Sequence, residues 1–81
     1  MQAIDAIRNR ILELCEERRI TPNRLAAMSG ISRATVRNIL NGRSKNPGAV
    51  TLMKLCIGLD MTIFDFFDTD AFRNLNRALN K

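Results

Sequence analysis

Hydrophobic positions recur with helical spacing from the start of this chain. Between Ala3 and Arg19 the apolar side chains fall at offsets of 0, 3, 7, 10 and 11 positions: Ile4, Ile7, Ile11, Leu14 and Cys15. This spacing places them on one face of a helix with about 3.6 residues per turn, and charged residues occupy the opposite face. The pattern predicts an amphipathic helix over residues 3–19.

Capping residues divide the next part of the chain into two short helices. Thr21, which a proline follows, is typical of an N-cap, and Gly30 is expected to end that helix because glycine adopts the left-handed conformation at low cost. Ser32 predicts the N-cap of a third helix over residues 33–41, which Gly42 ends. Two helices joined by a tight turn are therefore expected here.

The second half of the chain predicts a loop and two further helices. Residues 43–48 (RSKNPG) have the composition of a surface turn. A fourth helix follows, and its buried side is expected to hold Val50, Leu52, Met53, Leu55, Cys56 and Leu59. Thr62 is expected to cap a fifth helix that ends near Phe67, whose aromatic residues are predicted to form a lid over the core: Phe64, Phe66 and Phe67.

A last amphipathic helix is expected from Asp70 to Asn80, with Phe72, Leu75 and Leu79 on one stripe. This stripe can fold back on its own bundle or pair with the same stripe of a second subunit. No segment alternates with period two, so the predicted fold is all-α. We expect a five-helix domain over residues 1–68 and an appended C-terminal helix, a candidate dimerisation element, over residues 69–81.

Length and composition argue against an enzyme. The chain has 81 residues, enough for one small core, and it contains no histidine, the commonest general base and metal ligand. We therefore expect no catalytic site, no metal and no cofactor.

The two cysteines, Cys15 and Cys56, lie in apolar segments, so reduced core residues are the first interpretation and a disulfide the second. No apolar run approaches the length of a membrane span, so a cytoplasmic location is expected.

The charge of the chain is concentrated in its middle. There are 13 Lys and Arg against 8 Asp and Glu, which gives a net charge of +5. From Arg18 to Lys54 every charged residue is basic, whereas four aspartates precede the next basic residue after that stretch, Arg73. Such a block is either ordinary solvated surface or the footprint of a nucleic acid, and the motif within it favours the second.

Residues 21–42 have the small, turn-forming and inward-facing positions of a helix-turn-helix unit. Ala26 allows the two helices to cross closely, and the inward apolar residues are Leu25, Ile31, Val36 and Ile39. With the continuous stretch ITPNRLAAMSGISRATVRNILNGRSKNPGAVTLMKLCIGL, the chain resembles the Cro and phage-repressor type of helix-turn-helix protein, the XRE family, over about Ile4 to Phe67. The resemblance implies a five-helix domain that binds double-stranded DNA, normally as a homodimer on two half-sites, with its third helix in the major groove.

Four residues of the third helix are candidate base readers. With Val36 and Ile39 turned inward, the outward side chains are Arg33, Ala34, Arg37 and Asn38. Arginine matches the O6/N7 edge of guanine, asparagine can pair with adenine, and alanine can contact a thymine methyl group. Arg33 and Asn38 are the preferred readers, and Arg37 can reach either a base or a phosphate.

Candidate phosphate contacts flank this helix on both sides. The N-terminus of the second helix offers free N–H groups and a positive dipole end, which selects Thr21, Asn23 and Arg24, with Ser32 at the start of the third helix. In relatives the region after the third helix contacts the other side of the half-site; the corresponding residues are Asn41, Arg43, Ser44 and Lys45.

Three features depart from the family pattern, one of which is an apolar pair, Cys15 and Leu40, where several relatives carry an Arg–Glu ion pair. Pro22 stands where relatives often carry a glutamine that contacts phosphate, so one anchor is missing. Asp60 stands where relatives commonly carry glycine, a position that requires the left-handed conformation.

The function expected from the sequence is a sequence-specific DNA-binding repressor. The alternative is a protein-interaction module, such as an antitoxin that binds a toxin, for which an apolar outward face would be expected on the third helix.

Overall fold

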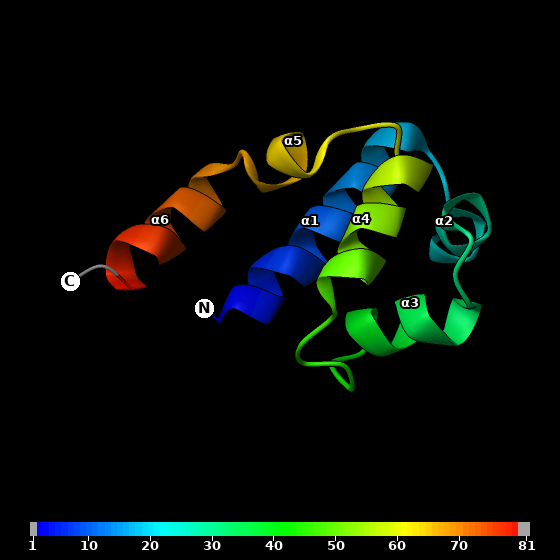
Figure 1. Ribbon diagram of the computed structural model, residues 1–81, viewed down its shortest axis with the longest axis horizontal. Coiled ribbons are helices and arrows are strands. Elements are labelled where there is room, and N and C mark those ends of the chain that lie inside the picture. The colour runs from blue at the N-terminus through cyan, green and yellow to red at the C-terminus, as the bar shows by residue number, and fades with distance from the viewer. Residues whose placement is uncertain (1, 80–81) are drawn as a thin grey trace.

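The computed structural model describes residues 2–79, and all of its regular secondary structure in that range is helical. The six helices follow one another along the chain (Figure 1): α1 (Ala3–Arg18), α2 (Pro22–Ser29), α3 (Arg33–Leu40), α4 (Ala49–Gly58), α5 (Ile63–Phe67) and α6 (Asp70–Leu79). The predicted all-α fold with five helices and an appended sixth is confirmed. Asn80, the expected last residue of the sixth helix, lies outside the described residues.

The core lies between α1, α2, α3 and α4 and is closed by α5. Its fully buried side chains come from all five helices or their caps: Ile11, Leu25, Val36, Ile39, Leu55, Leu59 and Phe66. The stripe predicted on the first helix is buried at Ile4, Ile11, Leu14 and Cys15, with Ile7 packed beside it. One apolar cluster therefore holds the whole bundle together.

The helix-turn-helix geometry follows from the capping residues. The Thr21 hydroxyl accepts a hydrogen bond from the Arg24 backbone N–H, and the Ser32 hydroxyl accepts one from the Thr35 N–H, each at 3.1 Å. Gly30 adopts a left-handed conformation (φ 68°) at the end of α2, as expected. Leu25 and Ala26 are completely buried, and α2 packs against both α3 and α4.

The expected orientation of α4 is wrong at two positions. Leu52, Leu55 and Cys56 are buried as predicted, but Val50 and Met53 lie on the outer surface, 67% and 54% exposed. The reason is that α4 is apolar on nearly every side, so its hydrophobic pattern does not identify the face that packs inward. The helix ends before Asp60, which adopts the left-handed conformation (φ 54°) that the family pattern implies for this position.

The aromatic lid is confirmed only in part. Phe66 is completely buried, and Phe67 packs against it edge to face with ring centroids 5.0 Å apart. Phe72, from the first turn of α6, joins them at 4.7 Å from Phe67. Phe64 is the exception, since it is 81% exposed and contributes nothing to the core.

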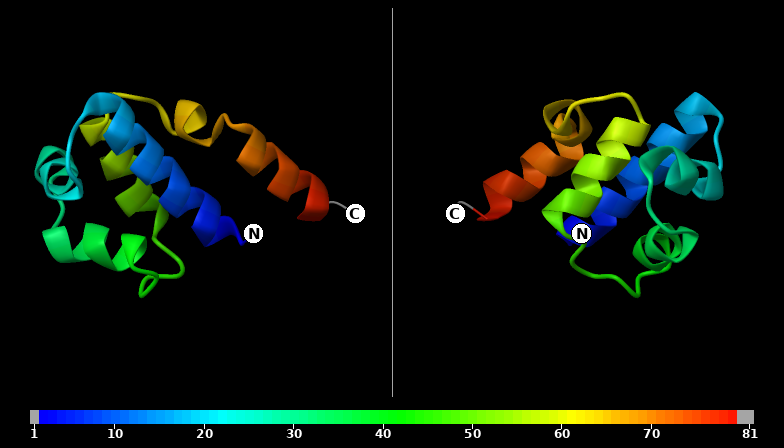
Figure 2. Two further views of the ribbon diagram at one scale, coloured as in Figure 1. Left: turned by 180° about the vertical axis from the view of Figure 1, so that it is seen from behind. Right: turned by 45° about the vertical axis from the view of Figure 1, so that its right-hand side comes forward.

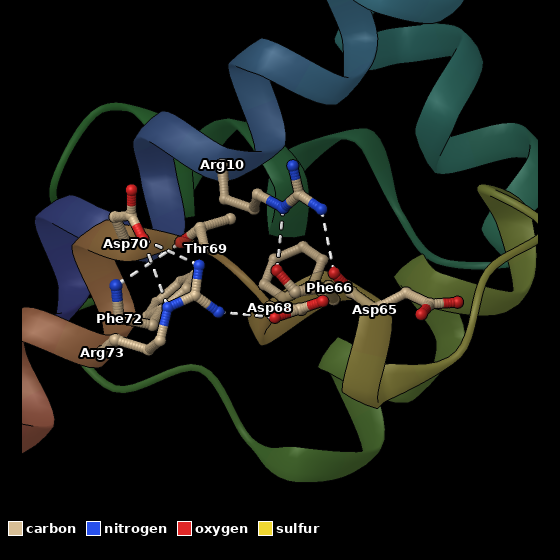
Figure 3. A network of polar contacts seen from close by, with 8 residues as sticks. All are labelled: Arg10, Asp65, Phe66, Asp68, Thr69, Asp70, Phe72 and Arg73. Carbon is tan, nitrogen blue, oxygen red and sulfur yellow. Dashed lines mark hydrogen bonds and ion pairs between the residues drawn. The ribbon is translucent and has the colours of Figure 1, made fainter.

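Helix α6 contacts α1 and then extends away from the bundle (Figures 1 and 2). Its start is fixed by Phe72 and by Arg73, which forms ion pairs with Asp68 and Asp70 at 2.6 and 2.8 Å (Figure 3). Phe72 therefore folds back on its own bundle. Leu75 is only half-buried, and the side chain of Leu79 lies outside what the structure describes.

Three arginines of α1 bind the carboxyl ends of three other helices. Arg8 donates to the Ile39 carbonyl of α3 at 3.3 Å, and Arg18 donates to the Leu59 carbonyl at the end of α4 at 3.1 Å. Arg10 donates to the Phe66 and Asp65 carbonyls of α5 at 2.7 and 2.9 Å (Figure 3). These cations donate to carbonyls near the helix ends, of which the Asp65 carbonyl also accepts from the Asp68 N–H, and they complement the helix dipoles.

Candidate nucleic-acid interface

Helix α3 lies at the edge of the molecule, with one face packed inward and the other open (Figure 1). Val36 and Ile39 are each 1% exposed and anchor the inner face. Among the predicted base readers, Arg33, Ala34 and Arg37 are exposed and Asn38 is half-buried. Arg33 and Arg37 are four positions apart, so they lie together on the outer face of this helix.

The arginines of this face differ from those of α1 in their bonding. Within residues 2–79, the side chains of Arg33 and Arg37 form no hydrogen bond or ion pair, whereas Arg8, Arg10 and Arg18 are bound to backbone carbonyls. An uncommitted guanidinium on an ordered helix can make planar, two-pronged hydrogen bonds to an external acceptor. These two side chains are therefore available to a ligand.

The amino end of α2 offers a second group of candidate contacts. Thr21, Asn23 and Arg24 are exposed there. The Thr21 oxygen caps the helix through the Arg24 N–H, and this leaves the hydroxyl hydrogen free to donate. Pro22 at the first helical position provides no N–H, as the departure from the family pattern implied. Asn23 and Arg24, the next two residues, carry polar side chains.

The loop after α3 is held in place by two local hydrogen bonds. The Asn41 side-chain oxygen accepts from the Arg43 N–H at 3.0 Å, and the Ser44 N–H donates to the Asn38 carbonyl at 2.8 Å. Arg43 and Lys45 are exposed on this loop, and Ser44 is half-buried. The loop therefore presents its two cations from a fixed backbone beside the end of α3.

Arg8 supports this site, and sequence reasoning did not identify it. Its guanidinium donates to Ile39 and lies beside Gly42, where an added Cβ would lie 3.4 Å from the Arg8 side chain. Gly42 has a φ of 85°, so it also requires glycine for its backbone conformation. The bond joins residues 31 positions apart, and no local pattern in the sequence signals such a contact.

The basic block divides into two parts in the folded chain. Arg18 turns to the end of α4, whereas the block from Arg24 to Lys45 lies on α2, α3 and the following loop, which carry no acidic residue. The aspartates instead cluster around the end of α4, α5 and the start of α6: Asp60, Asp65, Asp68 and Asp70. Two of these aspartates, Asp68 and Asp70, are paired with Arg73, whereas the cations of α2, α3 and the following loop have no carboxylate on their own elements.

The described residues hold no group of three side chains suited to bind a metal ion. Cys15 and Cys56 are buried free thiols, as the first interpretation expected. Burial raises the pKa of both thiols above the ordinary value, and the nearby cations Arg18 and Arg10, respectively, oppose this shift. Neither thiol is therefore set up for nucleophilic chemistry.

A family model described as the Cro/C1-type HTH DNA-binding domain matches residues 10–71. The chain belongs to this family. The match spans α2, α3 and the loop between α3 and α4, so the exposed arginines and the capped turn lie in the part of the chain that the family defines. The protein is accordingly a helix-turn-helix DNA-binding regulator, and its family is generally non-enzymatic.

This Cro/C1-type protein is also similar to a solved structure entitled "Crystal structure of the prophage Lp1 protein 11". The two chains are 31% identical, with a TM-score of 0.78 over 88% of this chain and 93% of the other. Among curated proteins none matches. In the range 2–79, no helix has both the length and the apolar character that a membrane crossing requires.

Proposed function

We propose that this Cro/C1-type protein is a sequence-specific transcriptional repressor that reads the major groove with α3. The observation that carries the proposal is the outer face of that helix, which Val36 and Ile39 anchor: Arg33 and Arg37 are exposed there, and their side chains have no partner in the described range 2–79.

Within this proposal each exposed residue of α3 has a distinct role. Arg33 pairs with the O6/N7 edge of guanine, Ala34 contacts a thymine methyl group, and Arg37 reaches a base or a phosphate. Asn38 reads adenine with its side-chain amide, while its backbone carbonyl holds the loop through Ser44. A well-placed pair of this kind contributes roughly 1–3 kcal/mol of discrimination between bases.

The phosphate contacts set the register of α3 in the groove. On one side we assign them to Thr21, Asn23, Arg24 and Ser32, at the amino ends of α2 and α3, where free N–H groups and the dipole favour an anion. On the other side we assign them to the loop residues Asn41, Arg43, Ser44 and Lys45. In this assignment the two groups precede and follow α3 along the chain, and each group contacts one of the two strands that border the groove.

We propose that the protein acts as a homodimer in the cytoplasm. One recognition helix reads few bases, and two helices about 34 Å apart would read two half-sites on one face of the duplex. In this proposal residues 1–68 contact DNA, and residues 69–81 form an appended element.

Selection of bound sequences from a random DNA pool, with the full chain, tests this function. The expected outcome is enrichment of a palindromic motif, with binding that weakens steeply as salt increases because phosphate contacts release counterions. Equal affinity for all sequences would contradict sequence-specific reading.

A protein partner, such as a toxin, is the alternative. The exposed apolar side chains of α4 and α5 favour it, whereas the outer face of α3, where this alternative predicts apolar residues, carries Arg33 and Arg37. Absence of any DNA binding would support that alternative.

A further inference from the structure

Two neighbouring carbonyls in the last turn of α3 accept hydrogen bonds from outside the helix. The Asn38 carbonyl accepts from the Ser44 N–H at 2.8 Å, a local bond within the following loop. The Ile39 carbonyl accepts from Arg8 Nε at 3.3 Å, and no other hydrogen bond to that oxygen occurs within residues 2–79. Arg8 therefore links α1 to the end of α3.

The guanidinium of Arg8 is oriented by a second contact on its own helix. Its Nη1 donates to the Asp5 carboxylate at 3.2 Å, and the other oxygen of that carboxylate accepts from the Gln2 N–H at 3.0 Å. The Arg8 side chain is 25% exposed. Because the guanidinium is planar, bonds from Nε and Nη1 to two different acceptors fix both its position and its tilt.

Gly42 brings the loop against the same guanidinium. A Cβ added at this position would lie 3.4 Å from Arg8 Nη2, and the φ of 85° is one that glycine adopts most readily. The chain continues from Gly42 directly into the loop that carries Arg43 and Lys45. A single side chain of α1 thus lies against both the last turn of α3 and the start of this loop.

The hydrophobic core does not hold the loop. No residue from Asn41 to Val50 is buried, and the closest backbone contact of α3 with another helix is with α2. Segments that bury few apolar side chains open locally at a low cost in free energy. The position of the loop therefore depends on its polar contacts, of which the contact with Arg8 is the one that reaches another helix.

We propose that Arg8 is a positioning residue for DNA binding, which holds the end of α3 and the loop so that Arg43 and Lys45 meet the DNA backbone. The inference rests on the proposed function, because the phosphate contacts of this loop belong to it. Arg8 acts through the loop and not as a phosphate ligand, since Asp5 already neutralises its charge. Phosphate contacts fix the register of a recognition helix, so a displaced loop weakens the binding of every sequence.

Hydrogen exchange of the full chain without DNA tests the link between Arg8 and the loop. In Arg8→Met the Ser44 N–H is expected to exchange about tenfold faster than in the wild type, because the loop loses a charged donor that restrains it. The Thr35 N–H, which Ser32 caps at the other end of α3, should keep its wild-type rate. An unchanged rate at Ser44 would overturn the inference.

Arg18→Met is the matched control for this measurement. It is the same substitution on the same helix, and it breaks the same kind of bond, but the carbonyl is that of Leu59 at the end of α4. The Ser44 N–H is expected to exchange at the wild-type rate in this variant. Equal acceleration in Arg8→Met and Arg18→Met would show a general loss of stability and would also overturn the inference.

A double-mutant cycle tests the effect on DNA binding, with the duplex selected from the random pool as the probe. Lys45→Ala is expected to weaken binding by the wild type but to change the affinity of Arg8→Met by less than about twofold, because the loop contact is already lost. Arg24→Ala, on α2, should weaken both backgrounds by the same factor, to within about twofold. The inference is overturned if Lys45→Ala has no effect in the wild type or the same effect in both backgrounds, as a direct phosphate contact by Arg8 would produce.

Arg8→Lys provides the same test should Arg8→Met not fold. Lysine keeps the positive charge but lacks the planar fork that bonds Asp5 and Ile39 at once, so faster exchange at Ser44 and coupling to Lys45 are again expected. Wild-type exchange at Ser44 with wild-type DNA affinity would overturn the inference. Circular dichroism shows whether each variant is folded.

The two measurements separate this inference from the proposed function. If Ser44 exchanges faster in Arg8→Met but the wild type binds no DNA, the repressor function is wrong and the link from Arg8 to the loop stands. If the wild type binds the selected duplex, but Arg8→Met neither speeds exchange at Ser44 nor couples to Lys45, the inference is wrong and the function stands.

Discussion

Gly58 of α4 lies directly against Ser29 of α2, so close that position 58 has no room for a side chain. A Cβ at Gly58 would overlap the Ser29 hydroxyl and would lie 3.0 Å from the Ser29 nitrogen and 3.1 Å from the Met28 carbonyl carbon. Both residues are buried. Helix α2, the first helix of the helix-turn-helix unit, thus packs against α4 through backbone atoms.

Gly58→Ala is therefore expected to lower the free energy of unfolding by about 1–3 kcal/mol, because backbone atoms cannot move aside as a flexible side chain does. Urea denaturation followed by circular dichroism measures this change. Gly48→Ser is the matched control, since position 48 faces open space and serine is a good N-cap for α4. Wild-type stability in Gly58→Ala would contradict the close contact.

Ser29→Ala is expected to behave differently. The Ser29 hydroxyl oxygen is buried and has no hydrogen-bond partner among the described residues. Removing it is expected to leave stability unchanged or slightly raised, since no bond is lost and a desolvated group disappears. In the double variant Ser29→Ala/Gly58→Ala, part of the stability lost by Gly58→Ala should return.

Arg10 is expected to be the most important arginine for stability. Its guanidinium holds two carbonyls of α5, so Arg10→Met leaves the Asp65 and Phe66 oxygens without this donor. The expected loss is about 1.5–3 kcal/mol in the free energy of unfolding, the usual range for hydrogen bonds to a charged group. Arg10→Lys should recover only part of it, because an ammonium lacks the planar fork.

Arg77→Met, an exposed arginine on α6, is the control for Arg10 and should change stability by less than about 0.5 kcal/mol. DNA affinity of folded Arg10→Met is expected to match that of the wild type, since Arg10 lies on α1 and faces α5. A loss of DNA affinity without a loss of stability would contradict the structural role of Arg10.

Arg33 and Lys45 are expected to contribute to DNA binding in different ways. Arg33→Ala should relax the preference at one base pair of the half-site, at a cost of roughly 1–3 kcal/mol for the preferred sequence. Lys45→Ala should weaken all sequences alike and reduce the salt slope by about one. Fluorescence anisotropy with matched and singly mismatched duplexes at several salt concentrations measures both. The assignment is wrong if the two variants lose affinity in the same pattern.

Ser32 has two separable roles in these proposals, as the cap of α3 and as a phosphate contact. Ser32→Asp keeps a good N-cap and should leave stability close to wild type, but the added negative charge should weaken DNA binding. Ser32→Ala should cost about 1 kcal/mol of stability through loss of the cap. Thermal unfolding and DNA titration of the two variants separate these effects. If Ser32→Asp binds DNA as tightly as the wild type, Ser32 does not face a phosphate.

Ionisation of the two cysteine thiols is expected to lower the free energy of unfolding at alkaline pH. Because burial raises the pKa of both thiols in the folded state, the unfolded chain loses their protons first, as the pH rises past 9.0. The free energy of unfolding should therefore be insensitive to these groups below that pH and should fall above it. The decrease should be smaller in Cys56→Ala. A thiol reagent at pH 8 should react with both cysteines in denaturant and only slowly in the native protein.

Much of the fold could be predicted from the sequence because its local signals are strong. Thr21, Ser32 and Thr62 cap the helices that they were expected to cap, and Gly30 and Gly42 adopt left-handed conformations where helices end. Capping is a contact between residues three positions apart, so it does not require knowledge of the remaining chain. For the same reason the outer and inner faces of α3 could be assigned from Val36 and Ile39 alone.

The sequence by itself determined the helices, their ends and the position of an uninterrupted basic segment, since each of these depends on periodicity, capping or the order of charges. Tertiary packing decided the rest. It selected which apolar side of α4 is buried and left Val50 and Met53 exposed, because a helix that is apolar all round carries no periodic signal. It also directed Arg8, Arg10 and Arg18 to carbonyls 31 to 56 positions away, whereas Arg33 and Arg37 have no side-chain partner among residues 2–79. Contacts at that separation depend on how helices stack, which no local pattern of residues encodes.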